Sequence, residues 1–359
     1  MTTPCDLLIV GTGYFAEIML NDIATTARQP VSVVVGGRNL ERLKWLCVAA
    51  NSRSALFGTS AVFQYAVMDM GSVDTIAEGL SKWQPTVVVQ SASLQSPWSV
   101  EGRGSGWSAL VNDAGFGLTV AFQAMFPVRT AMALQAIGSD AAFVNTCYPD
   151  VVNQVLRARG LPIMCGVGNI AIFSSAIQGT MPPSERADIR VLGAHYHLVE
   201  WRKPGAERSG TPVRVWKGET ELDGIEDAYR HIQLPYRDLN VISGSAAVPV
   251  LLALSGKGDV ESHVPGPGGL PGGYPVKVST KSVQLNLPKA ISEPQAIEWC
   301  RQFEAFDGAS VSSEGRVWYH PQAKAAVAKH DAAIAEGFHV NDLEVAYEAL
   351  AALRQSLGG

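Results

Sequence analysis

Several protein classes are excluded by what the sequence lacks. The five cysteines form no C-x-x-C pair, which argues against a zinc ribbon or a disulfide framework and is typical of a reducing compartment. No apolar run approaches the roughly 20 residues that a membrane-spanning helix needs. The opening MTTPCDLLIV has no basic segment before its apolar run, so we expect no signal peptide. These absences predict a cytoplasmic protein with no membrane partner.

Charge is also scarce. Only 17% of the 359 residues are charged, and the net charge is −5, whereas about 25% charged residues is usual for globular proteins. This balance argues against a broad nucleic-acid-binding surface. Hydrophobic residues make up 47% of the chain, which is enough for a large core. At about 150 residues per domain, the length predicts two domains.

The first motif follows an apolar, strand-like run at residues 6–10 and precedes a helix-like stretch. Its members are Gly11, Thr12, Gly13, Tyr14, Phe15 and Ala16. In a G-x-G-x-x-A turn the first glycine permits a tight turn, the second lets the backbone approach a pyrophosphate, and the alanine keeps helix and strand close. The free N–H groups at the helix N-terminus attract phosphate. We therefore predict a dinucleotide site here; the alternative is an α/β turn without a ligand.

The end of the second predicted strand indicates which dinucleotide binds. Residues 31–37 (VSVVVGG) end at Gly37, and Arg38 follows. An NAD-specific site carries an acidic residue at this place, whereas a guanidinium suits the 2′-phosphate of NADP. The sequence therefore favours NADP(H), supplied as NADPH for reduction, over NAD(H). The alternative is that Arg38 is a solvated residue at the start of the next helix.

Two further strand-like runs complete the first half of the predicted sheet. Residues 63–69 end at Asp69, which we expect near the adenine, and residues 85–93 carry Ser91 and Ala92 at their end. Three such β–α units within about 90 residues predict a parallel, doubly wound Rossmann sheet.

Two segments rich in glycine, proline and serine are expected to be loops. Residues 91–106 begin at the carboxyl edge of a strand, and residues 264–275 (VPGPGGLPGGYP) are expected to form neither helix nor β-ladder. Each is interpreted as a loop over the active site, with a plain surface or crossover loop as the alternative.

The middle of the chain resembles a known arrangement. Residues 141–150 (AAFVNTCYPD) predict a strand that ends in polar residues, among them Asn145 and Tyr148, and residues 161–170 (LPIMCGVGNI) predict the next strand. Strand, N-x-x-x-P-D, helix, strand and G-x-G-N in this order resemble the lactate/malate dehydrogenase superfamily, which includes the NAD-dependent glycoside hydrolases. The resemblance implies that Asn145 lies near the nicotinamide.

The same resemblance extends to a histidine. Residues 189–193 (IRVLG) predict a strand that leads into His195, similar to the catalytic histidine segment of those dehydrogenases. The family carries an Asp and a substrate-clamping Arg soon after the glycine-rich strand. Here residues 169–175 (NIAIFSS) hold neither charge, so lactate or malate would lack its clamp.

A second resemblance concerns the first 100 residues. V-G-G-R-N-x-E-R-L, then Asp69, then P-T-V-V-V-Q-S-A are similar to the NADP-binding domain of saccharopine-dehydrogenase-like reductases. Both resemblances imply hydride transfer on a Rossmann domain, and they differ about the substrate.

Two histidines and a tyrosine are the catalytic candidates. His195 is the first choice as acid/base, because imidazole titrates near neutrality. His197 would point to the same side if the strand continued, since side chains alternate along a strand, and would then support His195. Tyr148 is a weaker candidate proton donor. Alternatives are a metal site, with Cys147 or Asp150 as further ligands, and histidines that are hydrogen-bonded core residues; we predict no metal.

The second half of the chain differs in texture from the first. Strand-like runs alternate with loops after about residue 175, and helices dominate after residue 290. We therefore predict a dinucleotide-binding domain at 1–172 and an α+β substrate or dimerisation domain at 173–359, in a homodimer.

The sequence as a whole predicts an NADP-dependent oxidoreductase. It would transfer hydride between the nicotinamide and a carbonyl or imine of a small metabolite. The alternatives are a metal-assisted, NAD-dependent elimination or hydrolysis, and a nucleotide-binding protein without turnover.

Overall fold

A six-stranded parallel sheet occupies the N-terminal half of the chain, in a computed structural model that describes residues 4–95, 104–235 and 238–359. The strand order is β3-β2-β1-β4-β5-β6, and every neighbouring pair is parallel. The strands are β1 (Leu7–Val10), β2 (Val31–Gly37), β3 (Ala61–Val67), β4 (Val87–Gln90), β5 (Ala142–Asn145) and β6 (Cys165–Gly166). This is the Rossmann order, with the reversal between β1 and β4, so the predicted fold class is confirmed.

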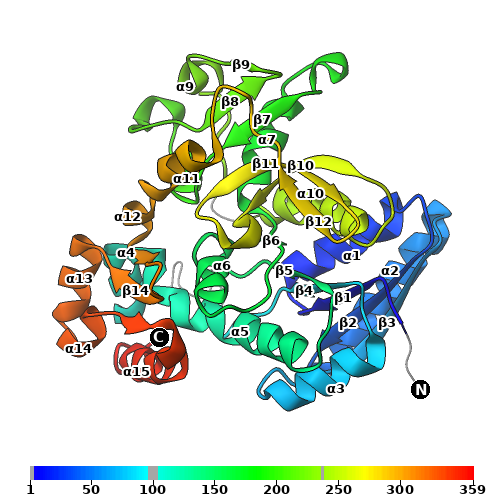
Figure 1. Ribbon diagram of the computed structural model, residues 1–359, viewed down its shortest axis with the longest axis horizontal. Coiled ribbons are helices and arrows are strands. Elements are labelled where there is room, and N and C mark those ends of the chain that lie inside the picture. The colour runs from blue at the N-terminus through cyan, green and yellow to red at the C-terminus, as the bar shows by residue number, and fades with distance from the viewer. Residues whose placement is uncertain (1–3, 96–103, 236–237) are drawn as a thin grey trace.

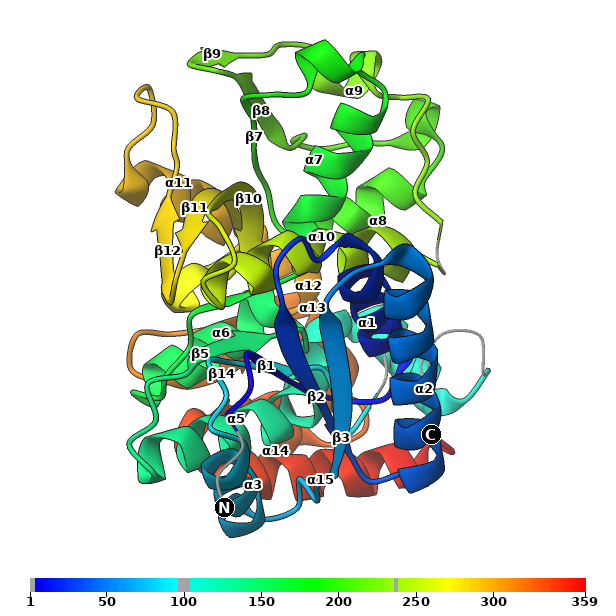
Figure 2. The same cartoon turned by 90° about the vertical axis from the view of Figure 1, so that its right-hand side faces the viewer.

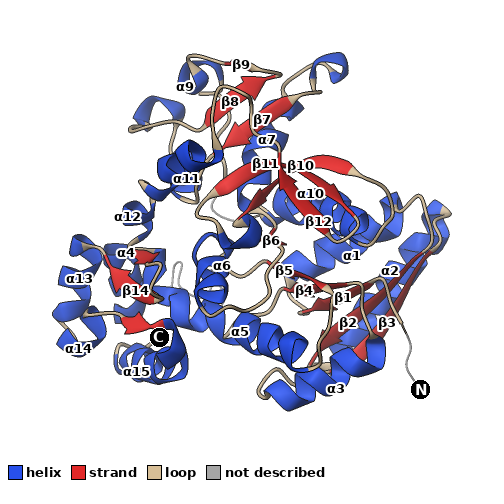
Figure 3. Cartoon of the chain, viewed as in Figure 1, coloured by secondary structure: helices blue, strands red, loops and turns tan. Residues whose placement is uncertain are grey.

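Helices cover both faces of this sheet, as Figures 1 and 3 show. One face carries α1 (Tyr14–Thr26), α2 (Leu40–Phe57) and α10 (Asn240–Leu254), and the other carries α3 (Val73–Trp83), α5 (Val120–Ala136) and α6 (Pro149–Ala158). Alternate residues of β1 enter the two cores: Leu7 and Ile9 join one, and Leu8 and Val10 the other. This is why the strands read as unbroken apolar runs.

Three small antiparallel sheets follow in the second half of the chain, as its alternating texture predicted. They are β7 (Ile189–Leu192) with β8 (Arg214–Lys217) and β9 (Thr220–Glu221), β10 (Val260–Pro265) with β11 (Gly273–Ser279) and β12 (Ser282–Leu285), and β13 (Ala309–Val311) with β14 (Arg316–Tyr319) and β15 (Phe338–His339). Figure 2 shows the first of them far from the parallel sheet.

The C-terminal helices pack against helices of the N-terminal half. α15 (Leu343–Ser356) lies against α5, and α13 (Pro321–Ala328) lies against α4 (Gly106–Ala114), so one apolar core contains residues from both ends of the chain. The other α-helices in the described ranges are α7 (Asn169–Gly179), α8 (Tyr196–Arg202), α9 (Ile225–Ala228), α11 (Glu293–Arg301), α12 (Glu304–Asp307) and α14 (Ala332–Ala335). The short 3-10 helices described are η2 (Phe116–Thr119), η3 (Pro183–Glu185), η4 (Gly205–Glu207), η5 (Pro267–Gly269) and η6 (Val340–Asp342). The boundary between residues 172 and 173 stays a prediction.

The expectation that residues 264–275 form neither helix nor β-ladder is wrong, because the segment contains strand residues at both ends and the short 3-10 helix η5 between them. β10 continues to Pro265 and β11 begins at Gly273, and Val264 pairs with Tyr274 across the ladder. Glycines with positive φ let the chain reverse its direction in the residues between the two strands. The segment is therefore the connection of a β-hairpin. The other loop expected, residues 91–106, includes positions 96–103, which lie outside the described residues.

Among the helices in the described ranges, none is long and apolar enough to cross a membrane.

Gly117→Ala tests a close contact between η2 and the segment that leads into β13. An ideal Cβ at Gly117 would lie 2.6 Å from the backbone nitrogen of Ala309 and 2.7 Å from the carbonyl oxygen of Asp307. The two segments must separate to admit a methyl group. We expect the free energy of unfolding, measured by urea titration, to fall by about 1–3 kcal/mol.

Gly179→Ala is the matched control, because Gly179 ends α7 and its ideal Cβ would have nothing within 4 Å. This variant should keep or raise stability, since alanine favours a helix over glycine by about 1 kcal/mol. Equal unfolding midpoints for the two variants would contradict the contact.

Candidate functional site

The glycine turn after β1 has the shape that the fingerprint requires. Gly11 has φ +141°, and an ideal Cβ there would lie 2.9 Å from the backbone carbon of Ser91, so only glycine lets the exits of β1 and β4 meet. Gly13 precedes α1 as its N-cap, and no heavy atom lies within 4 Å of its ideal Cβ position. Ala16 is fully buried against the sheet. The open N-terminus of α1 at the strand-order reversal therefore fits a diphosphate.

The two residues between Gly13 and Ala16 differ in their surroundings. Tyr14 is exposed. Phe15 is half-buried, and its ring lies 3.9 Å from the ideal Cβ position of Gly168, the residue that precedes α7. Phe15 therefore links the glycine turn to the exit of β6.

The end of β2 carries one guanidinium that is free to bind an anion. Arg38 is exposed after Gly37, and no ion pair to it exists in the described part of the chain. Arg42, by contrast, pairs with Glu17 at 2.7 Å and donates to the carbonyl oxygen of Thr12 at 3.3 Å. Arg38 is therefore the guanidinium at this strand end whose donors are not engaged by a carboxylate of the described residues; its role toward a 2′-phosphate stays a prediction.

Asp69 lies two residues beyond β3 and is exposed; its Oδ1 accepts from the N–H of Gly71 at 3.1 Å. At the exit of β4, the N–H of Ser91 donates to Val10 at 2.8 Å and its Oγ is buried without a partner in the described ranges. The carbonyl oxygen of Ala92 accepts from Gln90 at 2.8 Å. These residues lie along the carboxyl edge on both sides of the reversal.

Asn145 ends β5 and is fully buried. Its Nδ2 donates to the carbonyl oxygen of Cys147 at 3.1 Å and to Oδ1 of Asn153 at 2.9 Å, and its Oδ1 accepts from the N–H of Cys147 at 2.9 Å. The side chain thus shapes the turn that leads to Tyr148. A role of Asn145 toward the nicotinamide stays a prediction.

Tyr148 occupies a strained position beside His195. Its φ is +45°, a left-handed conformation that costs a bulky residue of order 1–3 kcal/mol. Its ring meets Phe116 edge-on at 4.8 Å between centroids and His195 at 5.4 Å. Oη is buried without a partner among the described residues. Burial, together with the charges of Asp307 and Asp150, raises the pKa of Tyr148 well above its usual value, so the phenol keeps its proton.

His195 is paired with a carboxylate from the distant helix α12. Its Nδ1 lies 2.7 Å from Oδ1 of Asp307, and its ring stacks on Phe116 at 5.8 Å between centroids. Burial lowers the pKa of His195, but the charge and hydrogen bond of Asp307 outweigh it, so the net shift is upward. No side chain or backbone group in the described chain bonds to Nε2, and 18% of the His195 side chain is exposed. This nitrogen is therefore the one that can exchange a proton with a ligand.

Asp150 joins the exits of two strands beside this pair. It lies in the first turn of α6, after β5, and its Oδ2 accepts a hydrogen bond from Asn169, the first residue of α7, after β6. Its Oδ1 is buried without a partner in the part of the chain described. Burial raises the pKa of Asp150, while the positive charge of His195 opposes that shift. The cluster of His195, Asp307, Tyr148 and Asp150 therefore lies beyond the carboxyl ends of β5 and β6.

The prediction that His197 points to the same side as His195 is wrong. β7 ends at Leu192 and α8 begins at Tyr196, so the side chains follow a helix and do not alternate. The His197 ring is buried against Trp299, its Nδ1 bonds the backbone of Ala194 at 3.0 Å, and burial lowers its pKa to about 4. His197 is thus a neutral core residue. In the described ranges no three His, Cys, Asp or Glu side chains are grouped to hold a metal ion.

Sequence reasoning missed two residues that contact His195, namely Asp307 and Phe116. Asp307 is 112 residues from His195 along the chain and follows no motif. Phe116 belongs to a run that reads only as an apolar helix. Their one shared signal is an adjacent glycine in each case, Gly115 and Gly308, both with positive φ, which marks a turn but not a function.

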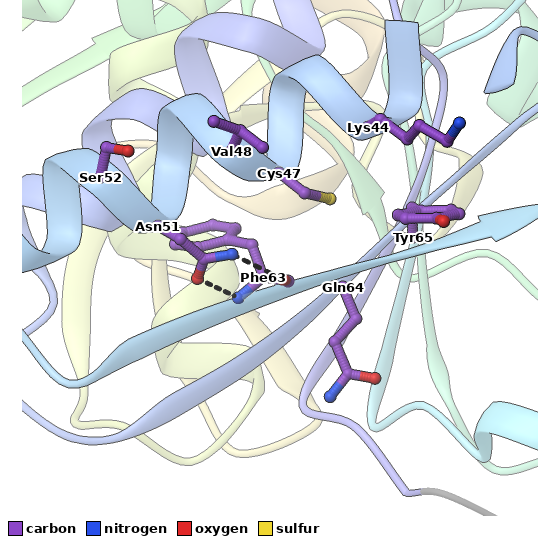
Figure 4. Close-up of a pocket in the computed structure, with 8 residues that line it drawn as sticks. All are labelled: Lys44, Cys47, Val48, Asn51, Ser52, Phe63, Gln64 and Tyr65. Carbon is purple, nitrogen blue, oxygen red and sulfur yellow. Dashed lines mark hydrogen bonds between the residues drawn. The ribbon is translucent and has the colours of Figure 1, made fainter. Parts of the chain in front are cut away.

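A cavity of about 750 Å³ lies away from this cluster, between α2 and β3. Figure 4 shows Asn51 facing Phe63, with which it exchanges two hydrogen bonds of 2.8 and 3.0 Å. Asn51 thereby forms hydrogen bonds with the carbonyl oxygen and the N–H of Phe63, a residue of the edge strand β3. The cavity borders no residue of the glycine turn or of the His195 cluster, so the chemistry places the candidate site elsewhere.

The fold is similar to solved enzyme structures. The 6-phospho-β-glucosidase from Thermotoga maritima matches with a TM-score of 0.51 and 10% identity, over 98% of this chain and 99% of that chain. A lactate dehydrogenase from Eimeria maxima, solved with NADH and oxamate, matches with a TM-score of 0.49 and 11% identity, over 85% and 94%. A malate dehydrogenase from Aeropyrum pernix gives 0.48 and 13%, over 82% and 95%.

A scan of protein-family models finds no match to the sequence, and neither does a search of curated proteins. At these identities the structural likeness shows the fold alone. The Rossmann fold is thus confirmed. The resemblance of the first 100 residues to saccharopine-dehydrogenase-like reductases stays a prediction.

Asp307→Asn tests the pairing of His195. Without the carboxylate, the largest upward contribution to the pKa of His195 is lost, while burial still lowers this pKa and the charge of Asp150 still raises it. We therefore expect the pKa of His195, followed by NMR titration, to fall. When the pKa of a histidine is higher in the folded state than in the unfolded state, its protonation stabilises the folded state. This stabilisation is complete at pH values below the unfolded-state pKa and is lost as the pH rises through the folded-state pKa. The variant should therefore lose more stability at ~pH 5.5 than at ~pH 9.

Asp259→Asn, at an exposed carboxylate, is the control and should leave both quantities unchanged. An unshifted His195 titration in Asp307→Asn would show that the carboxylate does not govern the imidazole.

Proposed function

We propose that the protein is an NADP(H)-dependent oxidoreductase that reduces a carbonyl or imine of a small molecule. The observation that carries the proposal is the His195–Asp307 pair beyond the carboxyl ends of β5 and β6. In this fold the half-sheet β1–β3 takes the adenosine part of a dinucleotide and the half-sheet β4–β6 takes the nicotinamide part. Hydride transfer to a carbonyl also needs a proton donor, and an unpaired imidazole nitrogen on the nicotinamide side can serve as one.

The cofactor would be held mainly by the backbone at residues 11–16. The N–H groups at the start of α1 would bind the diphosphate, Arg38 the 2′-phosphate, and Asp69 would lie near the adenine. Ser91 and Ala92 would border the ring end. NADPH, when bound there, supplies the hydride.

His195 would supply the proton. With Asp307 fixing Nδ1, the imidazolium directs the N–H of Nε2 outward, toward the oxygen or nitrogen that becomes negative as the carbon receives hydride. The proton moves to that atom, so a ketone becomes an alcohol or an imine an amine. Phe116 and Tyr148 hold the ring in place and exclude water from one side of it.

Two alternatives remain attached to this proposal. The likeness to a 6-phospho-β-glucosidase over 98% of the chain favours, as second candidate, a redox-assisted elimination or hydrolysis with tightly held NAD. That activity would leave the absorbance of the reduced nicotinamide unchanged over many turnovers and would stop with a chelator. A protein that binds the nucleotide without turnover would show neither oxidation of NADPH nor a reaction that a chelator stops. A homodimer and a cytoplasmic location also remain part of the proposal.

His195→Ala tests the proton donor. We expect the rate of NADPH oxidation, with a panel of small aldehydes, ketones and imines, to fall by about 10²–10⁴. Binding of NADPH, measured by calorimetry, should be unchanged, because His195 does not belong to the phosphate cradle. His330→Ala, at an exposed histidine, should behave as the wild type. An unchanged rate in His195→Ala would remove the assignment.

Arg38→Ala tests the cofactor preference. Loss of a charge-assisted contact to the 2′-phosphate should weaken NADPH binding by about 10- to 100-fold and leave NADH binding unchanged. Arg28→Ala, at an exposed arginine after α1, is the control. A site that prefers NAD(H) is the alternative outcome, since the Eimeria maxima lactate dehydrogenase was solved with NADH. If Arg38→Ala weakens the binding of NADPH and NADH equally, the argument from the 2′-phosphate is refuted.

A further inference from the structure

Two buried polar atoms beside His195 have no partner. Tyr148 and Asp150 are each 5% exposed, and neither Oη of the tyrosine nor Oδ1 of the aspartate has a hydrogen-bond partner among the described residues. Buried polar atoms without partners are uncommon, because each costs about 1–3 kcal/mol. Two of them at one histidine call for an explanation.

Both side chains are held in place by the surrounding structure. Asp150 is anchored through its other oxygen by Asn169. Tyr148 is fixed by its edge-on contact with Phe116 and by a left-handed backbone that only a rigid turn can maintain. The chain therefore sustains strain and two desolvated groups at this one place, as binding sites commonly do.

The neighbouring carboxylates each have one oxygen in a hydrogen bond, as Asp150 has, but in the described ranges neither has a second oxygen that is buried without a partner. Asp307 bonds His195 at 2.7 Å, and Glu304 accepts from Gln154 at 2.8 Å. Asp150 is thus the carboxylate beside His195 that keeps an oxygen for a ligand. An acceptor of this kind recognises a hydroxyl or an ammonium group.

We propose that Asp150 and Tyr148 bind a hydrogen-bond donor, a hydroxyl or an ammonium group, on the carbon next to the group that is reduced. The substrate is then an α-hydroxy or α-amino carbonyl compound, and not an α-keto acid. This inference rests on the proposed function, because it uses His195 as the proton donor to the adjacent oxygen. The charge of Arg202 also acts on His195, but a carboxylate substrate that used this charge would be repelled by Asp150.

Four ketones of similar size test the proposal: hydroxyacetone, aminoacetone, pyruvate and butanone. NADPH binding is first measured by calorimetry. The probes are then compared by kcat/KM for NADPH oxidation and by the rise in melting temperature that about 10 mM of each gives to the NADP-saturated protein. We expect hydroxyacetone or aminoacetone to exceed both pyruvate and butanone by about 10-fold or more.

Two variants assign this preference to its residues. Asp150→Asn should lower kcat/KM for aminoacetone by about 10- to 100-fold and lower it less for hydroxyacetone, because only the ammonium group loses a charged partner. Tyr148→Phe should weaken the binding of both donors and leave butanone unchanged. Tyr148→Phe should not melt lower than the wild type, because it removes an unpaired buried hydroxyl, and Asp150→Asn should not either, because it removes a desolvated charge and keeps an oxygen that can accept from Asn169. A purely structural role would lower the melting temperature and leave the order of probes intact.

The outcomes separate the inference from the function beneath it. Failure of NADPH to bind overturns the proposed function. If NADPH binds but pyruvate or butanone is preferred, or no probe raises the melting temperature, the donor-binding subsite is refuted and the oxidoreductase proposal stands. If Asp150→Asn keeps the wild-type order of probes, Asp150 is not the group that recognises them.

Discussion

The hydrogen bond between His195 and Asp307 joins segments 112 residues apart, and the candidate site depends on it. The imidazole enters from the start of α8, and the carboxylate comes from the end of α12. Without the carboxylate, the pKa of His195 would lose its largest upward contribution and Nδ1 would lose the hydrogen bond that orients it. With it, one nitrogen is fixed and the other is presented outward with a proton. The C-terminal half of the chain thus completes the chemistry of a sheet built by the N-terminal half.

The parallel sheet imposes the second constraint. All six strands end at the same edge, so the residues that follow them are brought together however far apart they lie in sequence. The glycine turn follows β1, Arg38 follows β2, and Tyr148 follows β5. A dinucleotide laid along this edge would meet a phosphate cradle first and a proton donor last. The groups left unpaired at the far end are a cost in stability that a binding role explains.

The sequence predicted what local patterns control. The apolar runs and the glycine turn were sufficient to predict the Rossmann sheet, because a strand that is buried on both faces is apolar along most of its length. The placement of His195 after a strand was also correct. The expectation for His197 was wrong because it required β7, which ends at Leu192, to continue to His197, whereas the chain turns into α8 at Tyr196. The ladder across residues 264–275 was missed because glycine and proline density does not show how short a turn is.

The rest of the site could not be read from the sequence, for a physical reason. Asp307 and Phe116 reach His195 through tertiary packing of α12 and η2 around the start of α8, and no spacing rule connects positions so far apart. Asp150 was visible as a polar residue after a strand, but its lack of a partner depends on the surrounding burial. Arg38 differs from these, because the role proposed for it follows from its place at the end of a strand.

A crystal structure of the protein with NADP⁺ is the most direct test of the central claim. The account predicts a diphosphate on the backbone of residues 11–13, a 2′-phosphate at Arg38, and a nicotinamide ring whose C4 faces Nε2 of His195 with room for one small carbonyl compound between them. A nucleotide bound elsewhere, or a ring turned away from His195, would contradict it.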